Sequence, residues 1–121
     1  MPRNLGLGRK AKIKQGRDFA RVRQQGERLA CGCLIMNWMR LDPDEESRCG
    51  IIASGKLGKA VVRNRARRLL REAFRLHRHE LAQPVDMVLV ARNSIIGKNY
   101  AEVEKDFLTS LTKAGLFKLA N

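Results

Sequence analysis

The segment 61–78, VVRNRARRLLREAFRLHR, constrains the fold more than any other part of the chain, because it carries two periodic patterns at once. Apolar side chains recur at steps of three and four residues, as they do along one side of a helix: Val62, Ala66, Leu69, Ala73 and Leu76. Polar side chains, nearly all arginine, recur at the same steps on the opposite side: Asn64, Arg68, Arg71, Arg75 and Arg78. The pattern predicts a helix over about 58–81 that buries one side and leaves a row of cations on the other.

The cationic side is unfavourable unless something anionic covers it. Like charges three or four residues apart destabilise a helix by about 0.2–0.5 kcal/mol per pair, and Glu72 offsets only part of this repulsion. A solvated surface helix usually mixes acids and bases, whereas arginine dominates here, and its planar guanidinium fits phosphate oxygens in pairs. We therefore interpret this side as a face that binds a polyanion, with a solvated face as the alternative.

The charge of the whole chain agrees with that interpretation. Among 121 residues, 25 are Lys or Arg and 12 are Asp or Glu, which gives a net charge of +13. Such an excess favours an anionic partner, with nucleic acid the first candidate and an anionic membrane surface the second. No apolar run approaches the roughly 20 residues that a membrane-spanning helix requires, so we expect no membrane span.

The length fits a single domain over 1–121, with residues 1–14 as a flexible basic arm. That arm lacks the apolar middle of a secretory signal. The cysteines, Cys31, Cys33 and Cys49, are odd in number, which argues against a disulfide framework and suits a reducing compartment. We therefore expect a cytoplasmic protein.

Shorter patterns predict the remaining elements. Residues 17–25 have the composition of a short helix that ends at Gly26, and Asn99 with Glu102 has the spacing of a capping box that starts a last helix. Strands are expected over 27–31, 34–41, 48–54 and 85–92. This order predicts an α/β (α+β) sandwich with a small central sheet of about four strands and three helices, in which the long helix crosses between two candidate parallel strands.

No combination of residues indicates a catalytic centre of the protein's own. GIIASGK, residues 50–56, matches the spacing of a phosphate-binding loop, but Leu57 stands where a magnesium-binding Ser or Thr is needed. The acidic run within 42–46 falls in a predicted turn, where solvated carboxylates are the simpler interpretation than a metal-dependent nuclease site. We therefore expect no catalytic residues.

The histidines and cysteines give no stronger signal. His77 and His79 lie at the far end of the predicted basic helix, with no carboxylate close in sequence expected to orient them, and we interpret them as a surface pair. The C-x-C of Cys31 and Cys33 lacks the spacing of a structural zinc site, so small packed residues are the better interpretation and no protein metal site is predicted.

Three residues outside the long helix are left with open interpretations by the sequence. Phe19 is either a core residue under the first helix or a ring at a cleft edge that stacks on a base. Asn37 and Trp38 are neighbours on one strand and must face opposite sides of the sheet, although the sequence does not say which side is covered.

The motif RNRARRLLREAFR, preceded by SGKLGKAVV, resembles the signature of the bacterial ribonuclease P protein subunit. In that family an RNR triplet on a helix is followed by a basic residue, Arg, Leu and a further Arg; the residues that match are Arg63, Asn64, Arg65, Arg67, Arg68, Leu69 and Arg71. Weaker matches are DFARVRQQG for a first helix closed by Gly, an R-x-G strand at Arg48 and Gly50, and DMVLVAR for the strand after the long helix. The similarity covers roughly residues 12–115.

The resemblance implies a left-handed β-α-β crossover, against the usual right-handed rule. It also implies that the chain is the accessory subunit of an endoribonuclease whose catalyst is a large RNA. That RNA removes the 5′ leader of precursor tRNA and holds most of the magnesium, so the implied partners are the catalytic RNA and precursor tRNA.

The resemblance assigns two groups of contacts. The residues implied to bind the catalytic RNA are Lys59, Arg63, Asn64, Arg65, Arg67, Arg68, Arg71 and Arg75. A cleft between the first helix and the sheet would hold the single-stranded leader, through Phe19, Asn37 and Lys56. Departures from the family pattern fall near this cleft: Arg23 and Asn37 replace frequent aromatics, and Gly55–Lys56 replaces a frequent tandem lysine.

Two other functions compete with this one. A ribosomal or general RNA/DNA-binding protein without an associated enzyme would show the same charge and the same salt-dependent binding. A membrane-surface helix is disfavoured, because the apolar side of 61–78 uses Ala and Leu at core spacing and has no Trp anchor.

Overall fold

The computed structural model describes residues 12–13 and 16–118, and the structural statements below concern that part of the chain. Its helices are α1 (Gly16–Gln25), α2 (Ala60–His77) and α3 (Tyr100–Ala114). Its strands are β1 (Glu27–Cys31), β2 (Leu34–Arg40), β3 (Arg48–Ile52) and β4 (Val85–Ala91). Three short 3₁₀ helices connect them: η2 (Gly55–Leu57), η3 (Arg78–Glu80) and η4 (Asn93–Ile95).

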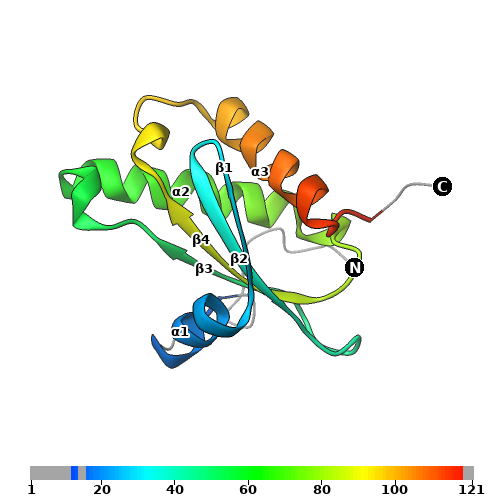
Figure 1. Ribbon diagram of the computed structural model, residues 1–121. Coiled ribbons are helices and arrows are strands. Elements are labelled where there is room, and N and C mark those ends of the chain that lie inside the picture. The colour runs from blue at the N-terminus through cyan, green and yellow to red at the C-terminus, as the bar shows by residue number, and fades with distance from the viewer. Residues whose placement is uncertain (1–11, 14–15, 119–121) are drawn as a thin grey trace, which may run out of the picture.

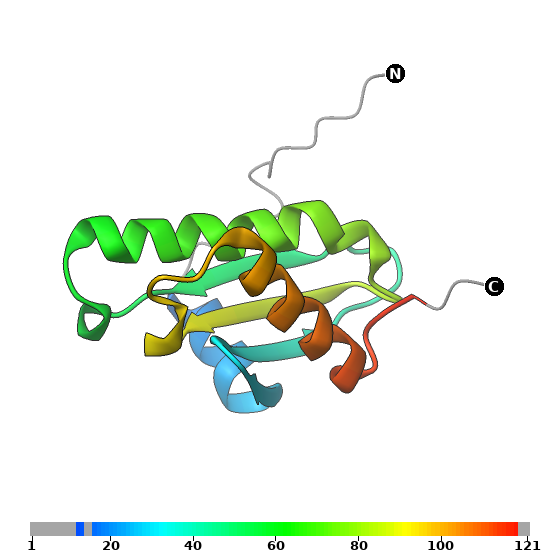
Figure 2. The same cartoon turned by 90° about the horizontal axis from the view of Figure 1, so that it is seen from above.

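The strands form one mixed sheet in the order β1-β2-β4-β3. The pairs β1–β2 and β2–β4 are antiparallel, whereas β3 and β4 are parallel and joined through α2. Seen from the side of α2 with the strands pointing upward, β4 lies to the left of β3, so the crossover is left-handed (Figure 2). The α+β sandwich expected from the sequence is confirmed.

Helices cover both faces of the sheet (Figure 1). α2 and α3 lie side by side on one face, above a core whose largest fully buried side chains include Phe74, Phe107, Leu34 and Met36. α1 lies alone on the opposite face, above a much smaller cluster formed by Ile13, Val22 and Val88. The long helix is therefore anchored to the main core, while α1 packs on the smaller cluster, which Phe19, Met39, Ile52 and Val90 extend as partly buried side chains.

The apolar side of α2 is buried as predicted, but it is wider than the sequence pattern suggested. Ala66, Leu69 and Ala73 are buried, while Val62 and Leu76 are partly buried against the same core. Leu70 and Phe74 are also fully buried, because α2 lies over β3 and β4 and its buried sector extends towards the edge strand β3. The helix ends at His77 rather than near 81, since residues 78–80 tighten into η3.

The capping box at the start of α3 is confirmed. The Asn99 side chain accepts a hydrogen bond from the Glu102 backbone N–H at 2.9 Å, and the Glu102 carboxylate accepts from the Asn99 N–H at 3.1 Å. Gly115 ends the helix in the left-handed conformation, with φ of 71°.

Most of the expected basic arm lies outside the described residues. Of 1–14, the structure describes Lys12 and Ile13, which lie along the outer edge of β3. The Ile13 N–H donates to the Cys49 carbonyl at 3.1 Å, and the Ile13 side chain is buried under α1. This short contact brings the described end of the N-terminal segment close to Phe19.

Candidate nucleic-acid interface

The outward side of α2 presents exposed cations. Arg68 and Arg71 lie on the side opposite the buried seam, and both side chains are exposed. Within the described residues, neither guanidinium makes an ion pair with a carboxylate. Two neighbouring guanidiniums without anionic partners can each take a phosphate group in bidentate fashion.

The other arginines of the motif are bound by the protein itself. The Arg65 guanidinium donates to the backbone carbonyl of Lys98 at 2.8 Å, and this bond holds the loop that precedes α3. Arg67 donates to the Asn64 side chain at 2.9 Å and to the Ala53 carbonyl at 3.3 Å. These bonds fix the direction of both side chains, although a guanidinium has further donors for an outside anion.

Arg75 and Arg63 also differ from the two exposed arginines. Arg75 forms a bidentate pair with Glu72 at 2.6 and 2.9 Å, and this hydrogen bond lowers the pKa of Glu72. Arg63 is partly buried, and its Nε has no hydrogen-bond partner among the described residues. The arginines of the motif are thus divided: Arg68 and Arg71 reach outward, whereas the side chains of Arg65, Arg67 and Arg75 also form hydrogen bonds within the protein.

Lysines extend the cationic face towards the start of the helix. Lys59 is the N-cap residue of α2, and Lys56 lies in η2 one turn earlier; both are exposed. The chain turns sharply between them at Gly58, whose φ is 123°, a value that only glycine adopts without strain.

Phe19 both packs on the sheet and lines a pocket. Its ring lies so close over Gly50 that a Cβ added there would lie 2.5 Å from ring carbons. The ring also borders a pocket of about 160 Å³ between α1, β3 and α2. This pocket is lined by Lys12, Ile13, Phe19, Cys49, Gly50, Ile51 and Arg71. Both interpretations of Phe19 are therefore compatible with its surroundings, and Arg71 borders the pocket as well as belonging to the exposed row.

Comparison with known proteins settles the family. A family model described as Ribonuclease P matches residues 7–115. The chain belongs to the bacterial ribonuclease P protein family. The ribonuclease P protein component of Syntrophomonas wolfei is 37% identical over 111 residues, which cover 92% of each chain, and that of Geobacillus kaustophilus is 36% identical over 112 residues, which cover 93% of each.

Solved structures of ribonuclease P proteins have the same fold. The RNase P protein of Staphylococcus aureus aligns with a TM-score of 0.80 at 27% identity, covering 88% of this chain and 97% of that chain. The RNase P protein of Thermotoga maritima aligns with a TM-score of 0.75 at 25% identity, covering 84% of this chain and 96% of that chain.

The three leader contacts implied by membership of the ribonuclease P family do not share one pocket. Asn37 is only 2% exposed and faces α1, whereas Trp38 is buried in the main core on the other face, as their neighbouring positions required. Asn37 borders a second pocket of about 340 Å³, together with Ala20, Arg23, Gln24 and Arg28. Lys56 lines neither pocket.

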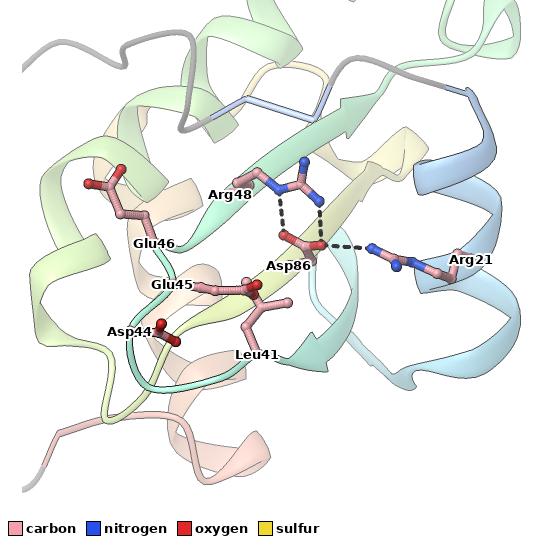
Figure 3. Close-up of a pocket in the computed structure, with 7 residues that line it drawn as sticks. All are labelled: Arg21, Leu41, Asp44, Glu45, Glu46, Arg48 and Asp86. Atoms are coloured by element: carbon pink, nitrogen blue, oxygen red, sulfur yellow. Dashed lines mark hydrogen bonds and ion pairs between the residues drawn. The ribbon is translucent and has the colours of Figure 1, made fainter.

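The sequence interpretation missed a polar cluster beneath α1. Asp86, from the otherwise apolar strand VDMVLVA, is fully buried and paired with Arg48 and Arg21. Asp86, Arg48 and Arg21 border a pocket of about 550 Å³. The turn between β2 and β3 lines the same pocket with the carboxylates of Asp44, Glu45 and Glu46 (Figure 3). A single acidic residue in an apolar strand indicates a buried carboxylate that needs a cationic partner, but the sequence of the strand does not identify that partner.

The interpretation of His77 as part of a surface pair was wrong. Its ring nitrogens lie 3.0 Å from a Glu80 carboxylate oxygen and 2.7 Å from a Glu104 carboxylate oxygen, and it joins α2 to α3. Only His79 is strongly exposed. The expectation of no orienting carboxylate failed because Glu80 is three residues away and Glu104 arrives from α3.

The described residues also bear on metals and membranes. No three His, Cys, Asp or Glu side chains in that part of the chain are arranged to hold a metal ion, and Cys31, Cys33 and Cys49 are free thiols. None of the described helices has the length and apolar content needed to cross a bilayer.

Proposed function

We propose that the chain acts as the protein subunit of ribonuclease P, in which α2 binds the catalytic RNA and the face beneath α1 binds the leader of precursor tRNA. The observation that carries this proposal is the position of Arg71. Its side chain belongs to the exposed row of α2 and also borders the pocket under Phe19. One arginine would thus link the two RNA-binding surfaces.

The contacts with the catalytic RNA would be of two kinds. Arg68, Arg71 and Lys59 are exposed, so they would bind phosphates directly. The motif residues whose side chains form hydrogen bonds within the protein would contribute from fixed positions: Asn64, Arg65, Arg67 and Arg75. Arg63 would contribute from its partly buried position in the first turn of α2. The family supports RNA binding by the chain, because its relatives are named ribonuclease P protein components.

The leader would lie across the face of the sheet that carries α1. Phe19 would stack on one unpaired base, a contact worth about 1–3 kcal/mol, while Arg71 and Lys12 would bind the adjoining phosphates. Asn37 and Lys56 are weaker candidates: the amide of Asn37 would contact a base at the second pocket, and Lys56 a phosphate beyond η2.

Catalysis would remain with the RNA. Magnesium would be held mainly by that RNA, where it supplies the activation of water and the stabilisation of charge at the scissile phosphate. The protein would add cations beside crowded phosphates, which raises substrate affinity and lowers the magnesium concentration needed. We place this activity in the cytoplasm, in a single RNA-binding domain.

The experiment is cleavage of precursor tRNA by the cognate catalytic RNA at low magnesium, with and without the protein. We expect cleavage to become efficient only when the protein is added. A general RNA-binding protein would bind the RNA with a similar salt dependence but would not rescue cleavage, and that result would refute the proposal.

A further inference from the structure

The first helix is held to the sheet by a smaller apolar cluster than the one beneath α2 and α3. Across Gly16–Gln25, Val22 is the fully buried residue, and it joins Ile13 and Val88 in this second cluster. Partly buried apolar side chains also pack against the cluster: Phe19, Met39, Ile52 and Val90. The sheet face opposite has a core many times larger. Because α1 carries Phe19, whatever fixes α1 also decides the shape of the pocket under Phe19.

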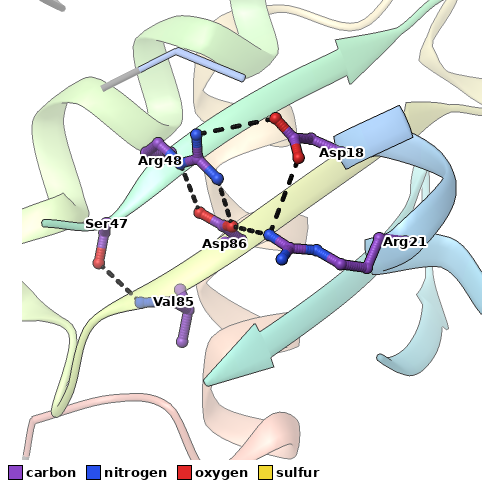
Figure 4. Close-up of polar contacts among 6 residues, drawn as sticks. All are labelled: Asp18, Arg21, Ser47, Arg48, Val85 and Asp86. Atoms are coloured by element: carbon purple, nitrogen blue, oxygen red, sulfur yellow. Dashed lines mark hydrogen bonds and ion pairs between the residues drawn. The ribbon is translucent and has the colours of Figure 1, made fainter. Parts of the chain in front are cut away.

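A buried carboxylate supplies a second attachment. Asp86 on the central strand β4 is 0% exposed and points towards α1 (Figure 4). Arg48 on β3 donates to it from Nε at 2.8 Å and from Nη2 at 2.7 Å, and Arg21 on α1 donates from Nη2 at 3.3 Å. The hydrogen bond to Asp86 raises the pKa of Arg48 above its ordinary value.

Asp18 completes the cluster from α1. Its two oxygens lie 4.0 Å from Arg48 Nη1 and 3.9 Å from Arg21 Nη2. Two acids and two bases therefore alternate around one centre, with Asp18 and Arg21 supplied by one turn of α1 (Figure 4). The charges balance within the cluster, which makes burial of Asp86 tolerable.

The cluster and the Phe19 contact together define the placement of α1. Arg48 and Gly50 are two residues apart on β3 and so point to the same face of the sheet. Asp18 contacts Arg48, while the next residue of α1, Phe19, lies on Gly50. An ionic contact and a steric contact one residue apart fix both the rotation of the helix and its position along the strand.

We propose that Asp18, Arg21, Arg48 and Asp86 are positioning residues that hold α1 where Phe19 can receive the leader. This inference rests on the proposed function, because it assumes that the leader binds beneath α1. It assigns the cluster no contact with RNA: its effect on the reaction passes through the placement of Phe19.

The sharpest variant is the double substitution Asp18→Asn with Arg21→Gln. It removes one acid and one base, so the net charge of +13 and the long-range attraction of RNA are unchanged. It also leaves the Arg48–Asp86 pair intact, so the buried carboxylate keeps its main partner and the domain stays folded. The matched control is Glu27→Gln with Arg40→Gln, which removes an exposed ion pair of 3.5 Å between β1 and β2.

The measurement is the KM and kcat of the reconstituted holoenzyme for precursor tRNAs with a leader of several nucleotides or of one nucleotide. The leader advantage is the factor by which the longer leader lowers KM relative to the one-nucleotide leader. We expect this factor to fall about tenfold in the double variant, an effect comparable to one lost stacking contact. The kcat and the affinity for the catalytic RNA should be unchanged. The control pair should keep the full advantage, and Arg48→Lys, which keeps the charge but not the bidentate geometry, should lose part of it.

A double-mutant cycle separates positioning from a direct effect. If the cluster acts through Phe19, adding the double substitution to Phe19→Ala should cause no further loss. Full retention of the leader advantage by the double variant, an equal loss for both leader lengths, or an additive loss on Phe19→Ala would each overturn the inference. A wild-type holoenzyme with no leader advantage would instead refute leader binding beneath α1, and the inference with it.

Discussion

The Nε2 atom of His77 lies 2.7 Å from a carboxylate oxygen of Glu104, so the last residue of α2 is joined directly to α3. The other ring nitrogen faces Glu80 at 3.0 Å, and the Tyr100 hydroxyl donates to the same Glu104 oxygen at 3.2 Å. Burial by itself lowers the pKa of His77, but the hydrogen bonds with Glu104 and Glu80 outweigh it, and the net pKa is raised. An imidazole between two carboxylates, whose protonated form these carboxylates favour, therefore holds the C-terminal end of α2.

This geometry predicts a pH-dependent contribution to stability. Because the folded pKa of His77 lies above the unfolded value of about 6.5, its contribution is fully present below that value and is lost as pH rises through the folded pKa. The free energy of unfolding of the wild type should exceed that of His77→Gln most at the acidic end, and the difference should shrink as the pH rises through the folded pKa. Urea unfolding across pH measures the difference. His79→Gln, at a largely exposed position, is the control, and a pH-independent gap for His77→Gln would contradict this account.

The contact between Gly50 and Phe19 predicts a steric effect. Gly50→Ala places a methyl group 2.5 Å from the Phe19 ring, so the ring and α1 must shift, at a cost of about 1–3 kcal/mol. Thermal or urea unfolding measures the loss. Gly16→Ala is the control, since no atom lies within 4 Å of a Cβ there. In the Phe19→Ala background, Gly50→Ala should cause little further loss of stability. If the loss persists there, its cause is a contact other than the one between residue 50 and the Phe19 ring.

The exposed row on α2 predicts loss of assembly on charge reversal. Arg68→Glu with Arg71→Glu should abolish binding to the catalytic RNA at moderate salt while the fold survives, because neither side chain is buried. Filter binding over a range of salt concentrations, with circular dichroism as the folding check, measures both effects. Lys105→Glu with Lys113→Glu on α3 changes the net charge equally and should retain most of the affinity. Comparable losses of affinity from the two pairs of substitutions would mean that the net charge of the protein, and not the position of these arginines, determines binding to the catalytic RNA.

The bound arginines predict a different response. Arg65→Gln removes the donor to the Lys98 carbonyl and should destabilise the domain by about 1 kcal/mol, whereas Arg68→Gln should leave stability within about 0.5 kcal/mol of wild type. Hydrogen exchange of the loop before α3 should accelerate only in Arg65→Gln. Equal stability of the two variants would show that the bond to Lys98 contributes nothing.

Much of the fold follows from local pattern. The alternation of arginine with Ala and Leu in 61–78 requires a one-sided helix, and Ala66, Leu69 and Ala73 are indeed buried. Asn99 and Glu102 are close in sequence, so their capping box is visible before any tertiary contact forms. The four strands are short segments separated by turn residues, and their limits differ from the predicted ones by two residues at most.

What the sequence by itself determined is the existence of a cationic helix on a small α+β sheet, because periodicity and net charge are local or additive properties. Only the tertiary structure decided which arginines remain available, since the partners of Arg65 and Arg48 lie 33 and 38 residues away. It also brought Phe19 onto Gly50 and Asp18 onto Arg48, contacts between elements that are not adjacent in the chain. Whether a side chain is hydrogen-bonded within the protein or available to an outside ligand depends on its neighbours, and these are set by how strands and helices are arranged in space.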